Sequence, residues 1–169
     1  MPYSLINLCA RILLDNKLTI AIAECSTGGK ITSNFSTVVD SAQFLKGGIV
    51  CYSSSNFYDP KLVSNELLEN FSIDSPEIAE SITQGLSKII DADIHIGITG
   101  HTNEVSNAHS PLGTMYMHAT FHGTHLFSKR YSFQGETNTI ITQTSMQLAY
   151  QLRDSLISLY EKKQYAISG

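Results

Sequence analysis

The chain has 169 residues, of which 42% are hydrophobic, with a formal net charge of −4 and a sequence pI near 5.8. This length and hydrophobic content fit one domain with a substantial core. The 11 Lys and Arg residues form no long cluster, which argues against a protein whose main task is to hold a nucleic-acid backbone. A local basic pocket remains compatible with this charge distribution.

The three cysteines, Cys9, Cys25 and Cys51, are an odd number without C-x-x-C spacing. This pattern predicts neither a disulfide framework nor a zinc knuckle and favours a reduced, cytoplasmic protein. The N-terminal segment carries internal charges and lacks the basic start and long apolar run of a signal peptide. No stretch approaches membrane-spanning length, so we expect neither a membrane nor a nucleic-acid partner.

The first third of the chain predicts alternating helices and strands. Apolar residues at helical spacing predict an amphipathic helix over 4–15. Residues 19–23 are apolar without alternation, which is typical of a strand covered on both faces, and a helix is predicted over 28–38. Residues 47–52 predict a second strand that ends on the same edge of the sheet as the first.

Further along, residues 61–70 are compatible with a helix, and Ser75 followed by Pro76 predicts the start of another. A third buried strand is predicted over 94–99. An antiparallel hairpin is predicted over 113–133, with His122 and Gly123 at its turn. A long helix closes the chain, with an apolar stripe that is either core or a subunit contact, formed by Leu148, Leu152, Leu156 and Leu159.

This order of elements predicts a three-layer α/β/α sandwich around a mixed, mostly parallel sheet with an antiparallel edge hairpin. We expect a single domain over residues 1–163. Residues 164–169 are expected to form a frayed tail.

The stretch 19–29, TIAIAECSTGG, is the strongest candidate for a chemical centre. It joins the first strand to a helix through Glu24, two potential nucleophiles, Cys25 and Ser26, and a pair of glycines. Such a turn lies at the carboxyl edge of an α/β sheet, where these folds bind ligands, and the N–H groups of the helix start favour an anion or oxyanion. The alternative, of equal weight, is an ordinary strand–helix connection whose glycines allow close packing.

Four stretches, in order and at compatible spacing, resemble the CinA C-terminal domain family, known as the stand-alone nicotinamide mononucleotide deamidase PncC. The family's A-E-S-C-T-G-G is similar to residues 23–29, AECSTGG, with the Ser-Cys order inverted, and G-G-x-x-x-Y-S is similar to residues 47–53. The S-x-x-x-A helix entry is matched by Ser75 and Ala79. The T-G and P-x-G-T-V-Y stretches are echoed by Thr99, Gly100, Pro111, Gly113, Thr114 and Tyr116.

The resemblance implies a cytoplasmic amidohydrolase of NAD recycling. Its substrate is a nicotinamide nucleotide, whose carboxamide is hydrolysed to the nicotinate nucleotide and ammonia. No cofactor is implied, and a homo-oligomer is expected. Another amide is also compatible with the sequence as the substrate.

Two positions of the implied active site depart from the family pattern. The family nucleophile is the Ser directly after Ala-Glu, where this chain has Cys25. The family Lys that assists proton transfer lies five residues after the motif Tyr, where this chain has Phe57, and an apolar ring accepts no proton. Lys61 replaces it only if an altered loop returns its amine to the site; otherwise it is a solvated lysine at a helix start.

Further departures lie in the loop and the last helix. Residues 101–103 read His-Thr-Asn where the family has x-A-G before a proline. The two arginine positions of the family's G-D-R-E-x-x-R stretch correspond to Thr137 and Ile141. If those arginines bind phosphate, neutral residues do not replace their charge-assisted hydrogen bonds.

The candidate catalytic residues are Cys25, Ser26, Tyr52 and His101. A thiol at a helix N-terminus is expected to have a lowered pKa, which makes Cys25 the first candidate nucleophile, with His101 as proton donor to the leaving amine. The alternatives are a small buried residue and a loop histidine. Ser26 is a displaced nucleophile of lower priority, and Tyr52 either contributes a hydroxyl or packs at a strand end.

The candidate ligand-binding residues lie in the same turns: Glu24, Thr27, Gly28, Gly29, Ser53, Thr99 and Gly100. For Glu24, anchoring a nearby donor is favoured over titration during catalysis. We expect no catalytic metal, because none of His95, His118, His122 and His125 lies on a predicted helix, as the paired ligands of a helical zinc motif do.

Two functions therefore remain open from the sequence. One is a nicotinamide-nucleotide amidohydrolase whose activity is impaired or altered by the changed residues. The other is a non-catalytic protein of the same fold that binds a nucleotide or a partner protein. The fold rests on many positions, whereas the function rests on the few that have changed.

Overall fold

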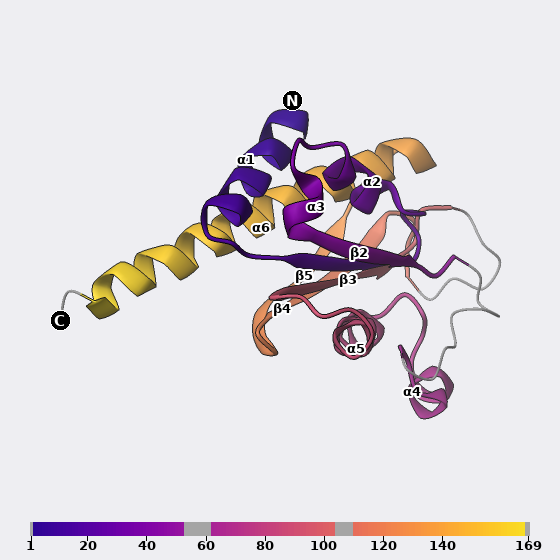
Figure 1. The fold of residues 1–169 in the computed structure, drawn as a ribbon. Coiled ribbons are helices and arrows are strands. Elements are labelled where there is room, and N and C mark those ends of the chain that lie inside the picture. The colour runs from indigo at the N-terminus through magenta and orange to yellow at the C-terminus, as the bar shows by residue number, and fades with distance from the viewer. Residues whose placement is uncertain (1, 53–61, 104–109, 168–169) are drawn as a thin grey trace.

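A computed structural model describes residues 2–52, 62–103 and 110–167. Its core is an open sheet with the strand order β2-β1-β3-β4-β5 (Figure 1). The strand β1 pairs in parallel with β2 and β3, whereas β4 pairs antiparallel with β3 and β5. The strand bounds are Ile20–Glu24 for β1, Leu45–Val50 for β2, Ile94–Gly100 for β3, Thr114–Phe121 for β4 and Thr124–Ser132 for β5.

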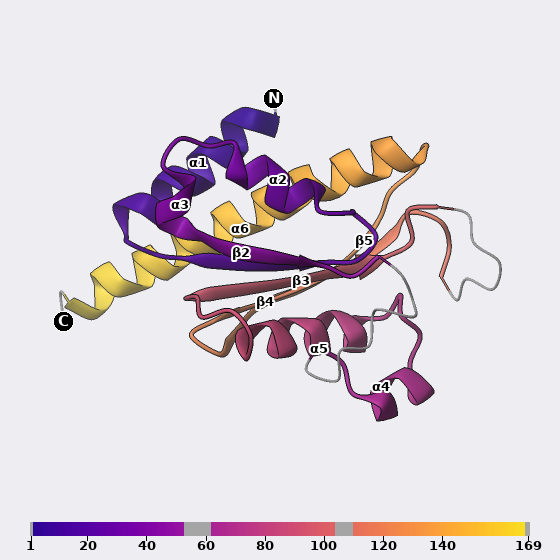
Figure 2. The same cartoon turned by 45° about the vertical axis from the view of Figure 1, so that its right-hand side comes forward.

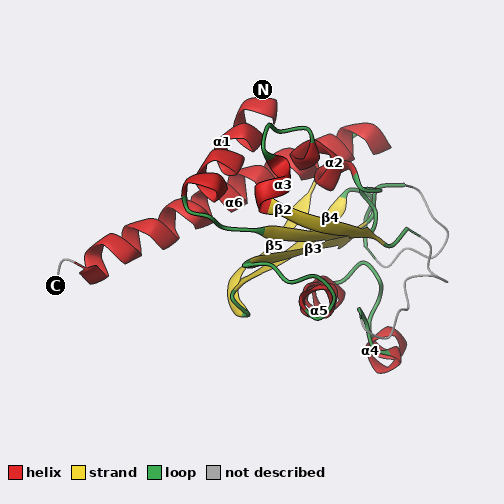
Figure 3. Ribbon diagram, in the orientation of Figure 1, coloured by secondary structure: helices red, strands yellow, loops and turns green. Residues whose placement is uncertain are grey.

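Helices cover both faces of the sheet (Figures 2 and 3), which confirms the predicted three-layer arrangement. On one face lie α1 (Pro2–Asp15), α2 (Lys30–Ser36), α3 (Ser41–Phe44) and α6 (Thr137–Ile167). On the other face lie α4 (Asn65–Asn70) and α5 (Pro76–Ser87).

Three of the four leucines in the apolar stripe of α6 belong to the core, whereas Leu159 is only partly buried. Leu148, Leu152 and Leu156 are fully buried in the larger of two hydrophobic clusters, between the sheet and the helices α1 and α6. A smaller cluster lies on the opposite face of the sheet under α5. The strands β1 and β3 are buried along their lengths, except for Gly100 at the end of β3, because helices cover both of their faces.

The sequence signals for α5 are confirmed, since the Ser75 hydroxyl accepts a hydrogen bond from the Ile78 N–H and Pro76 opens the helix. Two helices differ from expectation. The predicted helix over 28–38 spans Lys30–Ser36, because Gly28 and Gly29 have left-handed φ values that a helix excludes, and a short α3 follows after Asp40. The helix α6 continues to Ile167, into the expected tail, where Gln164 and Ala166 favour helix.

The topology brings several chain segments to one edge of the sheet. The parallel strands β1, β2 and β3 all end there, and β4 begins there because it runs antiparallel to β3. The backbone of His101 closes this corner: its N–H donates to the Thr114 carbonyl at 2.9 Å, and its carbonyl accepts from the Gly113 N–H at 2.8 Å. None of the described helices is long and apolar enough to span a bilayer.

Candidate active site

The turn after β1 is built around the buried carboxylate of Glu24. Its Oε2 accepts hydrogen bonds from the Thr27 hydroxyl at 2.7 Å and the Ile31 N–H at 3.0 Å. Its Oε1 accepts from the N–H of Thr32 at 2.7 Å and from the hydroxyl of the same residue. These donors confirm the prediction that Glu24 is an anchor.

The same hydrogen bonds change two sequence-based expectations. The N–H groups of Ile31 and Thr32 in the first turn of α2 face a protein carboxylate, so the expected anion site at these groups is wrong. Four donors also fill the acceptor positions of the Glu24 carboxylate, and the Thr27 hydroxyl is one of them. The structure therefore gives Glu24 and Thr27 a positioning role in place of the direct ligand contact that the sequence predicts.

The glycine pair that follows is required by backbone conformation and by space. Gly28 and Gly29 have φ values of 62° and 87°, in the left-handed region that disfavours other residues. A Cβ atom on Gly29 would lie 3.1 Å from Cγ2 of Val50, and one on Gly28 would lie 3.9 Å from the Tyr52 ring. The turn thus lies directly against the end of β2.

Cys25, the first candidate nucleophile, is only 4% exposed and points into the smaller hydrophobic cluster. Burial raises the pKa of its thiol well above the ordinary value, and a hydrogen bond with the Cys51 thiol raises it further, whereas the hydroxyl of Thr99 lowers it by less. The expected lowering of the pKa of Cys25 is therefore wrong. A neutral thiol is a weak nucleophile, because the thiolate is the reactive form.

Ser26 lies in a different environment from its neighbour. Its hydroxyl donates to the Gly100 carbonyl at 2.6 Å, and its own carbonyl accepts from the Thr102 hydroxyl at 3.0 Å. These two hydrogen bonds hold Ser26 against the residues on both sides of His101. The side chain of Ser26 is partly exposed, so a small molecule can reach it more readily than it can reach Cys25.

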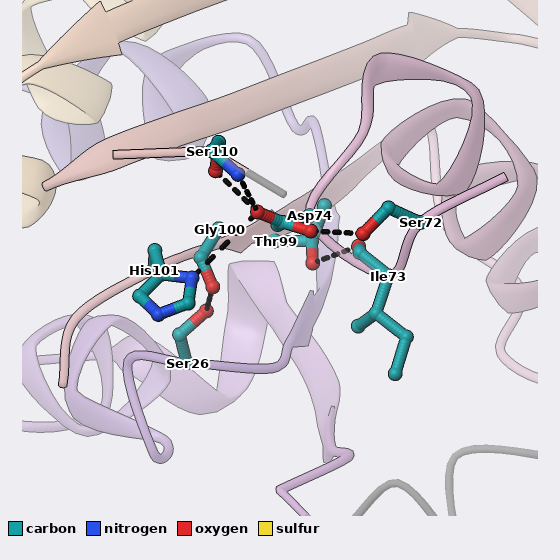
Figure 4. A network of polar contacts seen from close by, with 8 residues as sticks. All are labelled: Ser26, Ser72, Ile73, Asp74, Thr99, Gly100, His101 and Ser110. Carbon is teal, nitrogen blue, oxygen red and sulfur yellow. Dashed lines mark hydrogen bonds and ion pairs between the residues drawn. The ribbon is translucent and has the colours of Figure 1, made fainter. Parts of the chain in front are cut away.

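His101 is buried and faces a carboxylate that the sequence analysis did not single out. Its Nδ1 lies 3.6 Å from Oδ2 of Asp74 (Figure 4). The Asp74 carboxylate also accepts hydrogen bonds from the Ser72 hydroxyl and from the hydroxyl and N–H of Ser110. Burial raises the pKa of Asp74, but these donors lower it by more, so the net pKa is below its ordinary value and the group is charged at neutral pH.

The predicted partnership of Cys25 with His101 is absent among the described residues. The thiol interacts with Cys51 and Thr99, whereas the imidazole faces Asp74. Thr99 reaches the same neighbourhood from β3, since its hydroxyl donates to the Ile73 carbonyl at 2.8 Å. The structure thus brings together the segments after β1, after β3 and before α5, but it pairs them differently from the sequence-based expectation.

Sequence reasoning missed Asp74, although a signal for it is present. The stretch 72–75, Ser-Ile-Asp-Ser, is a polar turn directly before Pro76 at the start of a helix that follows a strand of the same edge. Attention to which helix starts share an edge with the strand ends would have selected it.

A second series of polar contacts lies along the same edge of the sheet, from the end of β2 to the start of α6. The Asn103 side-chain N–H donates to the Tyr52 hydroxyl at 3.1 Å, and the Thr137 hydroxyl donates to Oδ1 of Asn103 at 2.6 Å. Tyr52 is 65% exposed, so the alternative of a packed strand-end tyrosine is wrong. Thr137, the last residue of this series of contacts, is half-exposed and occupies one of the two positions where the family pattern has arginine.

Other predicted positions remain untested or lie outside the described residues. Ser53, Phe57 and Lys61 fall in the latter class. No group of three or more His, Cys, Asp or Glu residues that could hold a metal occurs in the ranges 2–52, 62–103 and 110–167. His118 and His125 contact each other on β4 and β5, with ring centroids 5.6 Å apart.

The fold agrees with comparisons to known proteins. The family model described as the CinA C-terminal domain matches residues 3–156. The chain belongs to the CinA C-terminal domain family. A CinA-like protein of Thermotoga neapolitana is 32% identical over 147 residues, which cover 86% of this chain and 36% of that protein. A CinA-like protein of Flavobacterium psychrophilum is 29% identical over 154 residues, which cover 90% of this chain and 36% of that protein.

Solved structures of CinA proteins share the fold. A CinA superfamily protein from Klebsiella pneumoniae superposes with a TM-score of 0.88 at 24% identity, covering 94% of this chain and 99% of that one. A competence damage-inducible protein A from the same species gives a TM-score of 0.80 at 26% identity, covering 96% of this chain and 97% of that one. This CinA-type chain spans about a third of the length of the curated relatives that it matches.

Proposed function

We propose that this CinA-type domain hydrolyses the carboxamide of a nicotinamide nucleotide, with a reaction centre altered from that of the family pattern. The observation that supports the proposal is the convergence of Ser26, His101 and Asp74 at the carboxyl edge of the sheet. An amide is a poor electrophile, and its hydrolysis needs a nucleophile, a proton acceptor and a proton donor within one site. These three residue types meet that requirement without the Lys of the family pattern.

The hydrogen-bonded residues Tyr52, Asn103 and Thr137 support the proposal that the substrate is a nucleotide. The phenol and amide groups suit the hydroxyls of a ribose. The neutral Thr137 offers a phosphate fewer charge-assisted hydrogen bonds than an arginine. We therefore expect weaker substrate binding than a site with arginines in these positions provides.

A non-catalytic binding protein is the alternative function. Two observations favour it: the neutral, buried thiol of Cys25 and the uncharged residues at the two arginine positions. A protein of this kind binds the nucleotide, or a partner protein, without releasing ammonia. Formation of a homo-oligomer and a cytoplasmic location stay predictions under both functions.

The purified chain is expected to release ammonia and the nicotinate nucleotide in equal amounts from nicotinamide mononucleotide. Ammonia is measured with a coupled enzyme assay, the acid product by chromatography, and binding by calorimetry. His125→Gln is a matched control, because this histidine is exposed on β5 and remote from the sheet edge described above. Binding of the nucleotide without ammonia release supports the alternative. The absence of both binding and release contradicts both nucleotide functions and leaves only the binding of a partner protein.

Thr137→Arg is expected to lower KM for nicotinamide mononucleotide by about tenfold, because a guanidinium next to the site restores a charge-assisted contact with the phosphate. Steady-state kinetics measure the effect. Asn138→Arg adds the same charge at the adjacent exposed position and controls for unspecific attraction. Equal decreases in KM for both variants would show that Thr137 does not face the phosphate.

A further inference from the structure

The adjacent residues Cys25 and Ser26 differ in what surrounds their reactive atoms. Cys25 lies in the hydrophobic cluster against Cys51, and both are at most 5% exposed. Ser26 is partly exposed and bonded to the residues that flank His101. The order of these two residues is inverted relative to the family motif. The hydroxyl of the pair therefore occupies the second position, on the side of the turn that faces His101.

The imidazole of His101 is oriented for proton transfer at its second nitrogen. With Nδ1 turned toward the negatively charged Asp74, the proton of the neutral ring is favoured on Nδ1, and the lone pair lies on Nε2. The separation of 3.6 Å is longer than a hydrogen bond, and catalytic contacts of this kind often tighten only when substrate binds. Asp74 is itself fixed by Ser72 and Ser110, so the carboxylate is held in place.

We propose that Ser26 is the nucleophile of this domain, that His101 is its proton acceptor and donor, and that Asp74 is a positioning residue for His101. Figure 4 shows the Ser26 hydroxyl bonded to the carbonyl of Gly100, the residue before His101, and the imidazole of His101 paired with Asp74. In the free protein the hydroxyl proton is held by this carbonyl. A rotation about the Cα–Cβ bond of Ser26 redirects it toward the imidazole.

The reaction follows from this arrangement and balances without a cofactor. The Ser26 oxygen forms a bond to the amide carbon, and its proton moves to Nε2 of His101. The imidazolium returns that proton to the amide nitrogen as the C–N bond breaks, which releases ammonia and leaves an ester on Ser26. Water then attacks the ester and gives a proton to His101. The acid product leaves, and the proton returns to the Ser26 oxygen.

Asp74 contributes through the charge of the imidazole. Its carboxylate stabilises the imidazolium that forms when His101 accepts the proton, and it keeps the ring in the tautomer with the lone pair on Nε2. Ser72 and Ser110 supply the hydrogen bonds that keep Asp74 ionised. The assignment of Ser26 as the nucleophile rests on the proposed amide hydrolysis, but it can be tested without the nucleotide.

The test is covalent labelling with diisopropyl fluorophosphate, which transfers its phosphoryl group to an activated serine oxygen as fluoride leaves. Mass spectrometry of the digested protein is expected to place the label on Ser26 in the wild type. Ser26→Ala is expected to remove the label. His101→Ala is expected to slow labelling by at least about 100-fold, as loss of a general base does. Labelling in the absence of hydrolysis would overturn the nicotinamide substrate and retain Ser26 as the nucleophile.

Asp74→Asn separates a positioning role from a merely structural one. We expect labelling to slow by about tenfold or more, because the imidazolium loses its negative neighbour, and Asp74→Glu, which keeps the carboxylate, is expected to restore part of the labelling rate. Circular dichroism confirms that each variant is folded. Ser87→Ala, at an exposed serine near the end of α5, and His125→Gln are matched controls expected to label at the wild-type rate.

Three results would overturn the proposal. The first is a wild type that carries no label on Ser26 while it hydrolyses the amide. The second is a labelling rate that is unchanged in folded His101→Ala. The third is amide hydrolysis that survives Ser26→Ala but is abolished by Cys25→Ala, which would return the nucleophile to the thiol.

Discussion

Glu24→Ala is expected to lower the free energy of unfolding by about 3–5 kcal/mol, because it leaves several buried donors without their charged acceptor. The carboxylate is fully buried and receives four hydrogen bonds from Thr27, Ile31 and Thr32. The carboxylate thereby links the end of β1 to the first turn of α2 through hydrogen bonds. This loss is a large part of the about 5–15 kcal/mol that stabilises an ordinary domain.

Urea denaturation followed by circular dichroism measures the effect of this substitution. Glu24→Gln keeps the shape of the side chain but replaces one acceptor oxygen by a donor, so we expect an intermediate loss of stability. Glu69→Ala, at an exposed position of α4, is the matched control and should change the free energy of unfolding by less than about 0.5 kcal/mol. A loss at Glu24→Ala as small as this control would show that the carboxylate does not hold the turn.

Gly97→Ala is expected to destabilise the domain by about 3 kcal/mol, because α5 packs against β3 with no room for a methyl group. A Cβ atom at this position would lie 2.6 Å from the Ala79 carbonyl oxygen and 2.7 Å from Cγ1 of Ile82, and it would also meet the Thr83 hydroxyl. The carbonyl belongs to the helix backbone and cannot turn aside. The helix or the strand must shift instead, and β3 leads directly to Thr99, Gly100 and His101.

Two further variants separate the sources of this loss of stability. Gly123→Ala lies in the hairpin turn at φ 75° with open space around it, so it reports the cost of the backbone conformation alone, about 1–2 kcal/mol. The double variant Gly97→Ala with Thr83→Ala removes one of the close neighbours, and we expect it to be less destabilised than the sum of the single variants. Additive losses in the denaturation experiment would contradict close packing as the cause.

Much of the fold was predictable because it depends on local and periodic signals. The uninterrupted apolar run in β1 indicated a strand covered on both faces, and the isoleucine-rich stretch of β3 indicated a buried strand. Ser75 and Pro76 marked the start of α5, and His122 with Gly123 marked the hairpin turn. The short helix α3 after Asp40 was not predicted, since nothing in the local pattern indicated a second helix there.

The candidate site was predictable only in part. The sequence located the turn that holds Cys25 and Ser26, and it selected His101 in the loop after β3. It ranked Cys25 above Ser26, because adjacent residues at a strand end point in opposite directions, and it expected a lowered pKa for the thiol. The tertiary structure reverses this ranking, because burial against Cys51 raises the pKa of Cys25 and leaves the hydroxyl of Ser26 as the accessible group.

By itself, the sequence of this chain determined the succession of strands and helices, the anchoring role of Glu24 and the family. Each of these depends on residue types at short spacing. Only the tertiary structure decided which reactive groups meet, because Asp74, His101 and Ser26 come from three segments that are distant along the chain. Their approach is fixed by the parallel pairing of β1 with β3 and by the packing of α5 on that sheet. Such long-range placement leaves no periodic signal in the sequence.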